Sequence, residues 1–105
     1  MNQRISYLEA EFKQNPLDPF NAYGLAMEFM ANNPSQALTW LEWLLVNIPD
    51  YLPTYYQAAS LYQDFDDAPN ALLCYKNGIA LAKAQNNPKI LSELERALFN
   101  FQLEN

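Results

Sequence analysis

The chain repeats one pattern of apolar and small residues along its central part. Self-similarity at a fixed period is typical of arrays of small helical or strand units that bury a shared core by stacking. The aligned positions are offset by 33 residues in the first segment of each copy and by 34 in the second, so the first copy has the shorter turn. The pairs are Ala22 with Tyr55, Leu25 with Ala58, Ala26 with Ala59, Phe29 with Tyr62, Ala37 with Ala71 and Leu41 with Tyr75.

Helix start signals divide the sequence into six segments. Asp18-Pro19, Asn33-Pro34 and Asn87-Pro88 each place a capping side chain before a proline, which the first helical turn accepts because its N–H groups have no partner within the helix. Apolar residues recur at three- and four-residue spacing within each segment. The predicted helices run from about Gln3 to Asn15, from Asp18-Pro19, from Asn33-Pro34 to Pro49, from Leu52-Pro53 to about Asp64, from about Ala68 to Gln85, and from Asn87-Pro88 to a polar tail at 102–105.

These segments predict an all-α fold in which antiparallel helix pairs stack into an α-α superhelix. A chain of 105 residues has room for one modest core, so we expect a single domain. The expected parts are an N-terminal helix resembling half a repeat (1–18), a first repeat (19–51), a second repeat (52–85) and a C-terminal capping helix (86–105) that meets solvent.

The second copy carries the residue types of a known repeat family at the right spacing. Small residues stand where antiparallel helices must approach to about 8–10 Å. With Pro49 closing the preceding copy, the positions Tyr55, Ala58, Ala59, Tyr62, Ala71 and Tyr75 resemble the tetratricopeptide repeat (TPR). The chain departs from the TPR pattern at four positions. Ala22 replaces an aromatic residue, Leu44 replaces a small one, and Lys83 replaces the final proline. Asp66 replaces the turn glycine, whose left-handed conformation Asp tolerates.

The stretch from Pro49 to Tyr56 further resembles small bacterial TPR proteins of uncharacterised role. The resemblance implies a module that binds other proteins and has no catalytic activity.

Charge and composition exclude several classes of function. The net charge is −6, and no Lys or Arg occurs between Lys13 and Lys76, so nucleic-acid phosphates would be repelled. The single Cys74 excludes an internal disulfide, which favours a reducing compartment. The start of the chain does not resemble a signal peptide, and apolar runs such as 43–46 are too short to span a bilayer. We expect an acidic cytoplasmic protein that binds neither nucleic acid nor membrane.

Residues for catalysis, cofactors or metals are missing. The chain has no histidine, one cysteine and no glycine-rich phosphate loop, which argues against an enzyme, a cofactor or a metal site. The acids Asp64, Asp66 and Asp67 lack the glycine of a calcium loop, and Tyr75 stands where its bidentate Glu belongs, so a solvated acidic turn is favoured. Cys74 is interpreted as a packing residue in preference to a redox thiol, because Lys76 is the only cation near it in the sequence.

The resemblance also implies a binding groove lined by the first helix of each pair. Lys, Arg and Asn that clamp a peptide carboxylate in some TPR domains are absent from this groove, so acidic chaperone tails are not expected to bind. A protein partner with an apolar or amphipathic segment and basic residues suits the Tyr and Met side chains better. The alternative that the terminal helices cover these positions stays open. The predicted partner-binding residues are Phe20, Tyr23, Met27, Met30, Tyr56, Ser60, Gln63 and Asp64.

Trp40 and Trp43 lie three residues apart, which places both on one side of a helix. They are either partly buried against a neighbouring helix or part of an apolar patch in which Trp43 mediates self-association as a homodimer. Three functions therefore stay open: a partner-binding adaptor, a self-associating structural module, and a catalytic or ligand-binding protein.

Overall fold

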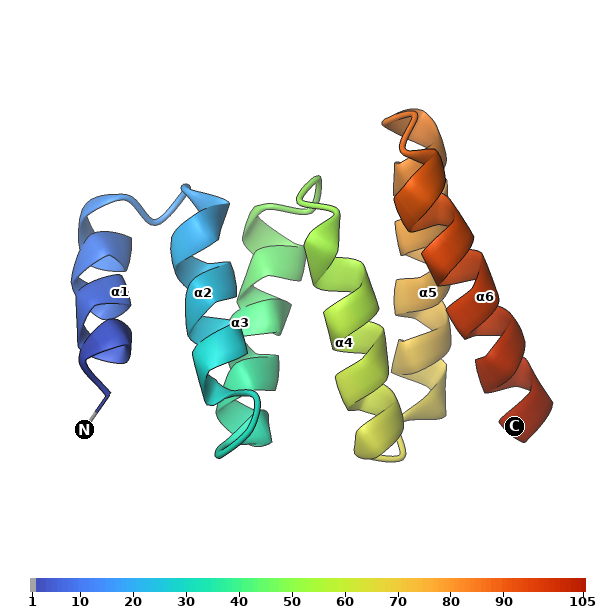
Figure 1. Ribbon diagram of the computed structural model, residues 1–105, viewed down its shortest axis with the longest axis horizontal. Coiled ribbons are helices and arrows are strands. Elements are labelled where there is room, and N and C mark those ends of the chain that lie inside the picture. Colours follow the sequence, from blue (N-terminus) through green and yellow to red (C-terminus); the bar gives the residue numbers. More distant parts are fainter. Residues whose placement is uncertain (1) are drawn as a thin grey trace. The chain divides into compact units, whose positions relative to one another are not determined.

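The computed structural model describes residues 2–105, and within them the chain is helical with no strand (Figure 1). The all-α prediction is therefore confirmed, and the predicted starts and ends agree closely with the structure. One difference lies at the C-terminal end, where residues expected to form a polar tail continue the last helix to Glu104. The helices are α1 (Gln3–Gln14), α2 (Pro19–Phe29), α3 (Pro34–Asn47), α4 (Pro53–Asp64), α5 (Ala68–Ala84) and α6 (Pro88–Glu104).

Side-chain caps explain where the helices begin. Five N-cap side chains accept hydrogen bonds from backbone N–H groups of the first turn, and four of these helices also have a proline at one of their first two positions. A cap of this kind stabilises a helix by about 1 kcal/mol, so the starts depend on local sequence alone. The capping residues are Asn2, Asp18, Asn33, Asp67 and Asn87.

Two helices end in the same left-handed turn. Asp66 (φ 59°) follows α4 and Asn86 (φ 54°) follows α5. In each turn the residue after the left-handed one donates its N–H to the carbonyl five positions earlier. These bonds run from Asp67 N–H to the Tyr62 carbonyl (2.8 Å) and from Asn87 N–H to the Ala82 carbonyl (2.9 Å). The expectation that Asp66 replaces the usual turn glycine is confirmed. The same residues, Asp67 and Asn87, are the N-caps of α5 and α6, so the end of one helix directly precedes the start of the next.

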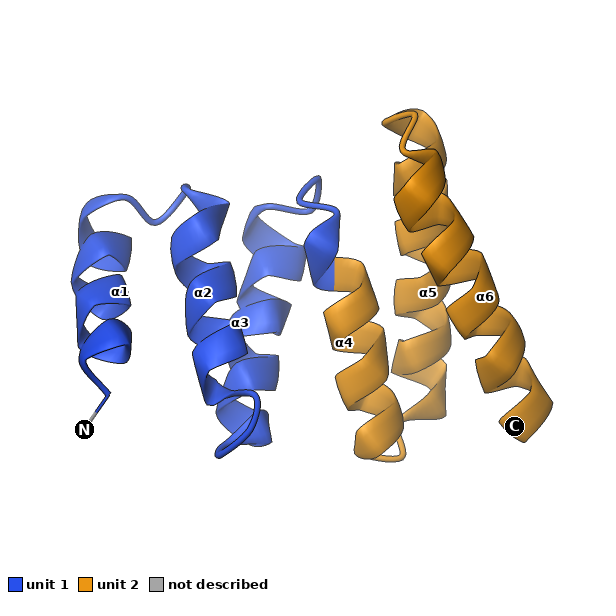
Figure 2. Ribbon diagram, in the orientation of Figure 1, with its two compact units in different colours: residues 1–54 blue, residues 55–105 orange. Residues whose placement is uncertain are grey.

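The chain divides into two compact units, one ending at Thr54 and the other beginning at Tyr55 (Figure 2). In the first unit α2 packs against both α1 and α3. In the second unit α6 runs antiparallel alongside α5, and Gly78 of α5 approaches Tyr55 of α4 (Figure 1). The division falls inside α4, whose first two residues belong to the first unit. The repeat boundaries predicted from the sequence stay a prediction.

The repeated pattern corresponds to the buried residues of both units. Phe29 is half-buried, and every other aligned position is at most 8% exposed. The small residues predicted at the close helix contacts are buried. Ala26 of α2 and Ala37 of α3 are fully buried, as are Ala59 and Ala71 in the second copy. The periodicity found in the sequence is thus the pattern of burial.

Gly78 marks a close helix approach in the second unit. A Cβ atom added there would lie 2.7 Å from the Tyr55 Cβ and 3.1 Å from the Leu94 Cδ1. Because the Tyr55 Cβ is fixed by its own helix backbone, a methyl group could be accepted only if α4 and α5 moved apart. At Gly24 the added atom would meet only the terminal carbons of Leu8, at 3.1 and 3.3 Å.

This difference predicts that alanine is tolerated at Gly24 and destabilises the protein at Gly78. Gly78→Ala should lower the free energy of unfolding by about 1–2 kcal/mol, since overpacking costs more than the helix propensity that alanine adds. Gly24→Ala should stay within about 1 kcal/mol of the wild type, because the Leu8 side chain can rotate away. Urea unfolding followed by circular dichroism measures both. Equal stability of the two variants would contradict the close approach of α4 and α5.

Candidate functional site

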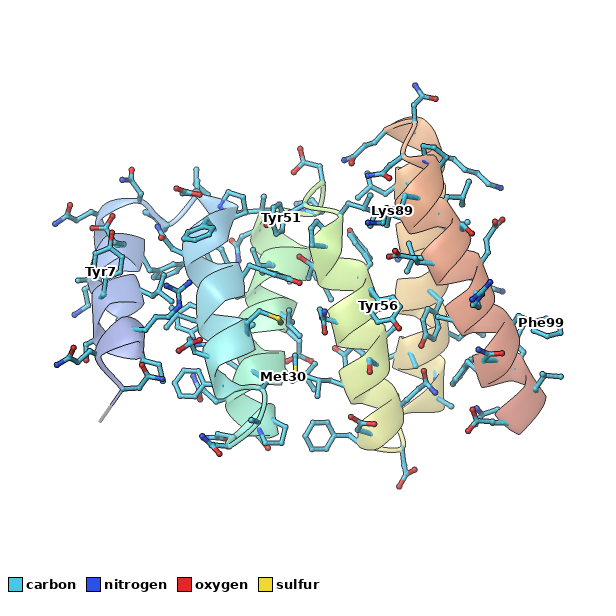
Figure 3. The ribbon with its side chains drawn as sticks, in the orientation of Figure 1. Tyr7, Met30, Tyr51, Tyr56, Lys89 and Phe99 are labelled. Atoms are coloured by element: carbon cyan, nitrogen blue, oxygen red, sulfur yellow. The ribbon has the colours of Figure 1, made fainter. Side chains whose placement is uncertain are left out.

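Four predicted binding residues form one face of α2, here called the α2 face: Phe20, Tyr23, Met27 and Met30. Their spacing of three and four residues keeps them on one side of the helix. Phe20 is 57% exposed, and the other three are half-buried. Met30 lies at the C-terminal end of α2, where it is the C-cap residue (Figure 3). The first unit therefore presents an aromatic and Met-containing surface to solvent.

Tyr23 does not stand alone on this face. Its ring makes an edge-to-face contact with Tyr51 from the turn before α4, with ring centroids 5.5 Å apart. Burial, and secondarily the negative charge of Asp18, raises the pKa of the Tyr51 phenol above its ordinary value. Tyr51 was not among the predicted site residues. Its sequence position in a turn gives no sign that it would support the α2 face.

The other four predicted residues lie on α4 and are called the α4 face: Tyr56, Ser60, Gln63 and Asp64. Tyr56 is 43% exposed and Asp64 is exposed, whereas Ser60 and Gln63 are half-buried. The side chain of Gln63 is engaged within the unit, because its Oε1 accepts a hydrogen bond from the Tyr75 hydroxyl. Tyr56 and Asp64 are thus the members of this face most open to a ligand.

Tyr75 connects the α4 face to the last helix. Its ring is 3% exposed and contacts Phe101 of α6 at a centroid distance of 5.6 Å. Burial is the first cause that raises the pKa of the Tyr75 phenol, followed by Tyr56, Asp64, Cys74 and Glu104. The phenol therefore stays protonated and donates to Gln63 at neutral pH.

The raised pKa predicts an alkaline loss of stability. Because the folded state holds the Tyr75 proton more tightly than the unfolded state, this contribution is complete below the ordinary tyrosine pKa of 10.0 and is lost as the pH rises through the higher folded value. Tyr75→Phe should fall less steeply in stability between about pH 9 and 11 than the wild type. Urea unfolding at several pH values across this range measures the free energy of unfolding of both proteins. Tyr7→Phe, at a position that is 61% exposed, is the matched control for removal of a tyrosine hydroxyl.

Both tryptophans of the chain pack against Phe12 of α1. The Phe12 ring lies 4.9 Å from the ring centroids of Trp40 and of Trp43, edge to face in each case. Both tryptophans are half-buried. The indole Nε1 of Trp40 is buried and has no hydrogen-bond partner within residues 2–105. The contact with Phe12 covers part of the Trp43 surface, and its role in self-association stays a prediction.

This cluster predicts that tryptophan fluorescence reports the docking of α1. Phe12→Ala should shift the emission to longer wavelength and lower the free energy of unfolding by about 2–3 kcal/mol, because two aromatic contacts of a half-buried ring are lost. Phe12→Leu keeps an apolar side chain and should lose less. An unchanged emission spectrum in Phe12→Ala would mean that α1 does not cover the tryptophans.

The remaining polar candidates have local structural roles. Asp67 accepts hydrogen bonds from the backbone N–H and the side-chain amide of Asn70, so it caps α5, and Asp66 makes the turn. The Cys74 side chain is buried, as the packing interpretation predicts. Among residues 2–105, no three His, Cys, Asp or Glu side chains are placed to hold a metal ion. None of the helices in that range combines the length and hydrophobicity needed to cross a bilayer.

Sequence reasoning missed a cleft in the second unit, formed where α4 ends, α5 begins and α6 ends. Two adjoining hollows share Ala68, Phe101 and Asn105, and their volumes are about 210 and 540 Å³. Residues 63–72 and 101–105 form its walls. No local pattern could reveal it, because the two segments meet only when α6 packs on α5.

The fold defines a class: an all-α protein built from repeated helix pairs. A TPR domain protein from Salinibacter ruber, solved in solution, is 39% identical to the chain, with a TM-score of 0.77 over 83% of this chain and 89% of that one. A crystal structure of a TPR domain protein from the same organism is 38% identical, with the same TM-score over 81% and 96% of the two chains. No protein-family model and no curated protein matched.

The chain therefore belongs to the tetratricopeptide repeat family, as its repeat positions indicated. Domains of this fold are general scaffolds for protein–protein interaction and are not built around a catalytic centre. The family assignment rests on sequence identity and coverage together, since both relatives align with more than four-fifths of the chain.

Proposed function

We propose that the protein binds an apolar or amphipathic segment of a partner protein, carrying basic residues, on the α2 face and the α4 face. The observation that carries this proposal is the exposure of aromatic side chains at predicted binding positions, with Phe20 57% and Tyr56 43% exposed. Rigid aromatic side chains lose little entropy on binding and often dominate interface energies. Met27 and Met30 add surface that adapts to an apolar partner.

Charge supports a basic partner. Neither face contains a Lys or Arg, while Asp64 is exposed at the end of the α4 face. A positively charged segment would be attracted to this surface, mainly through a faster association rate. The same charge pattern disfavours acidic C-terminal tails, for which the faces offer no cation.

The proposal is tested with a labelled amphipathic helix made of Leu and Lys, compared with a Leu/Glu peptide of equal length. Tyr56→Ala and Met27→Ala should each weaken binding of the Leu/Lys peptide about tenfold, which corresponds to about 1.4 kcal/mol, a moderate interface contribution. Fluorescence anisotropy measures the affinity. Tyr7→Ala is the matched control, because Tyr7 is an exposed tyrosine on α1 outside both faces (Figure 3).

Equal losses in Tyr7→Ala and Tyr56→Ala, or equal binding of the acidic peptide, would contradict the assignment of these faces. Binding of the basic peptide that the face variants leave intact would contradict it as well.

Self-association as a homodimer is the second candidate function. It is favoured by Phe99 and Leu103, which are 62% and 71% exposed four residues apart on α6. Light scattering across a concentration series distinguishes the candidates. A mass that rises with concentration and returns to the monomer in Trp43→Lys would favour self-association through Trp43, whereas a constant monomer mass leaves both faces to a partner.

A further inference from the structure

The cleft in the second unit has two chemically different halves. One half, about 210 Å³, is lined by Gln63, Asp66 and Glu104. The other, about 540 Å³, is lined by Pro69, Leu72 and Gln102. Both include Ala68, Phe101 and Asn105, so the polar and apolar halves adjoin.

The polar half attracts a cation. The carboxylates of Asp66 and Glu104 line it, and neither forms an ion pair or a side-chain hydrogen bond with another residue of the described chain. No Lys or Arg lines either half. Glu104 also belongs to the last turn of α6, where the helix dipole places partial negative charge.

The start of α5, which could attract an anion instead, is already neutralised. Pro69 has no N–H, the Asn70 N–H donates to the Asp67 side chain (3.2 Å), and the Ala71 N–H donates to the Asp67 carbonyl (3.0 Å). The electrostatic preference of the cleft is therefore for positive charge.

Side-chain contacts hold one wall of the cleft in place. Phe101 is 5% exposed and packs on Tyr75, whose hydroxyl donates to Gln63. Two carboxylates on an open surface would hold a cation only weakly, because solvent screens them. Here the adjoining apolar hollow can remove water from the aliphatic part of the same ligand, which adds hydrophobic free energy to the charge interaction.

We propose that this cleft binds an arginine side chain of a partner, with its guanidinium group between Asp66 and Glu104, and an apolar neighbouring residue against Pro69 and Leu72. Arginine fits better than lysine because its planar guanidinium group carries several N–H donors in a fixed fork, whereas lysine is a single point charge. The inference deepens the proposed function, since Gln63 belongs to both surfaces, but the cleft lies entirely in the second unit and is tested there.

The probe is N-acetyl-leucyl-arginine amide, titrated into the full chain and followed by two-dimensional ¹H–¹⁵N NMR. We expect the largest shifts at the side-chain amides of Gln63 and Asn105 and at the Ala68 N–H. The corresponding citrulline peptide, which has the same shape without the charge, should bind at least tenfold more weakly. Replacing leucine by glycine in the arginine peptide should also weaken binding, and Leu72→Ala should reduce this leucine preference.

The variants separate a built site from general acidity. Asp66→Asn with Glu104→Gln should weaken binding of the arginine peptide about tenfold, and Asn keeps the left-handed turn at position 66 because it tolerates this conformation. Glu93→Gln with Glu95→Gln removes the same charge from exposed positions of α6 that do not line the cleft, and should change little.

Three results would overturn the inference: equal binding of the citrulline peptide, equal losses in the two double variants, or shifts at Gln63 and Asn105 that follow protein concentration without peptide, which would indicate a second copy of the chain. Failure here with a positive Tyr56→Ala result would remove the cleft and leave the proposed function standing. Binding of the arginine peptide to the cleft, with no effect of Tyr56→Ala or Met27→Ala on binding of the Leu/Lys peptide, would leave the cleft standing and contradict the proposed function.

Discussion

The close approach of helices at small residues is the constraint on which the rest of the structure depends. Fully buried alanines occupy the corresponding places of both copies, and Gly78 leaves room for only a hydrogen atom beside Tyr55. Because helices packed this closely accept only small side chains where their axes cross, larger side chains must lie beside the crossing, either in the interior, as Tyr75 does, or facing solvent. The exposed aromatic residues on α2 and α4 are consistent with this division of space.

Tyrosines at the helix contacts combine packing with polar interactions. Tyr75 fills the interior beside Phe101 and donates its hydroxyl hydrogen to Gln63, while Tyr51 supports Tyr23 at the α2 face. Burial, and secondarily nearby negative charge, raises the pKa of each phenol, so each stays protonated at physiological pH. Rigid neutral side chains of this kind hold the neighbouring surfaces in place before a partner binds.

Local signals accounted for most of what could be predicted. Capping residues before prolines placed the helix starts, and Asp66 was expected to adopt the left-handed turn that the structure shows. The C-terminal end was less predictable: Gln102, Leu103 and Glu104, expected to form a polar tail, continue the helix that packs through Phe101. The side-chain engagement of Gln63 and the support from Tyr51 depend on contacts between segments that no local pattern encodes.

The amino-acid sequence by itself determined the helix order, the repeat family and the acidic surface without central Lys or Arg, because capping, periodicity and charge are properties of neighbouring residues. Only the tertiary structure decided which side chains remain available. Packing brought Phe12 against both tryptophans, engaged Gln63 with Tyr75, and joined residues 63–72 to 101–105 around one cleft. Those contacts arise from the way helices pack in space, and residues far apart in sequence meet only when the chain has folded.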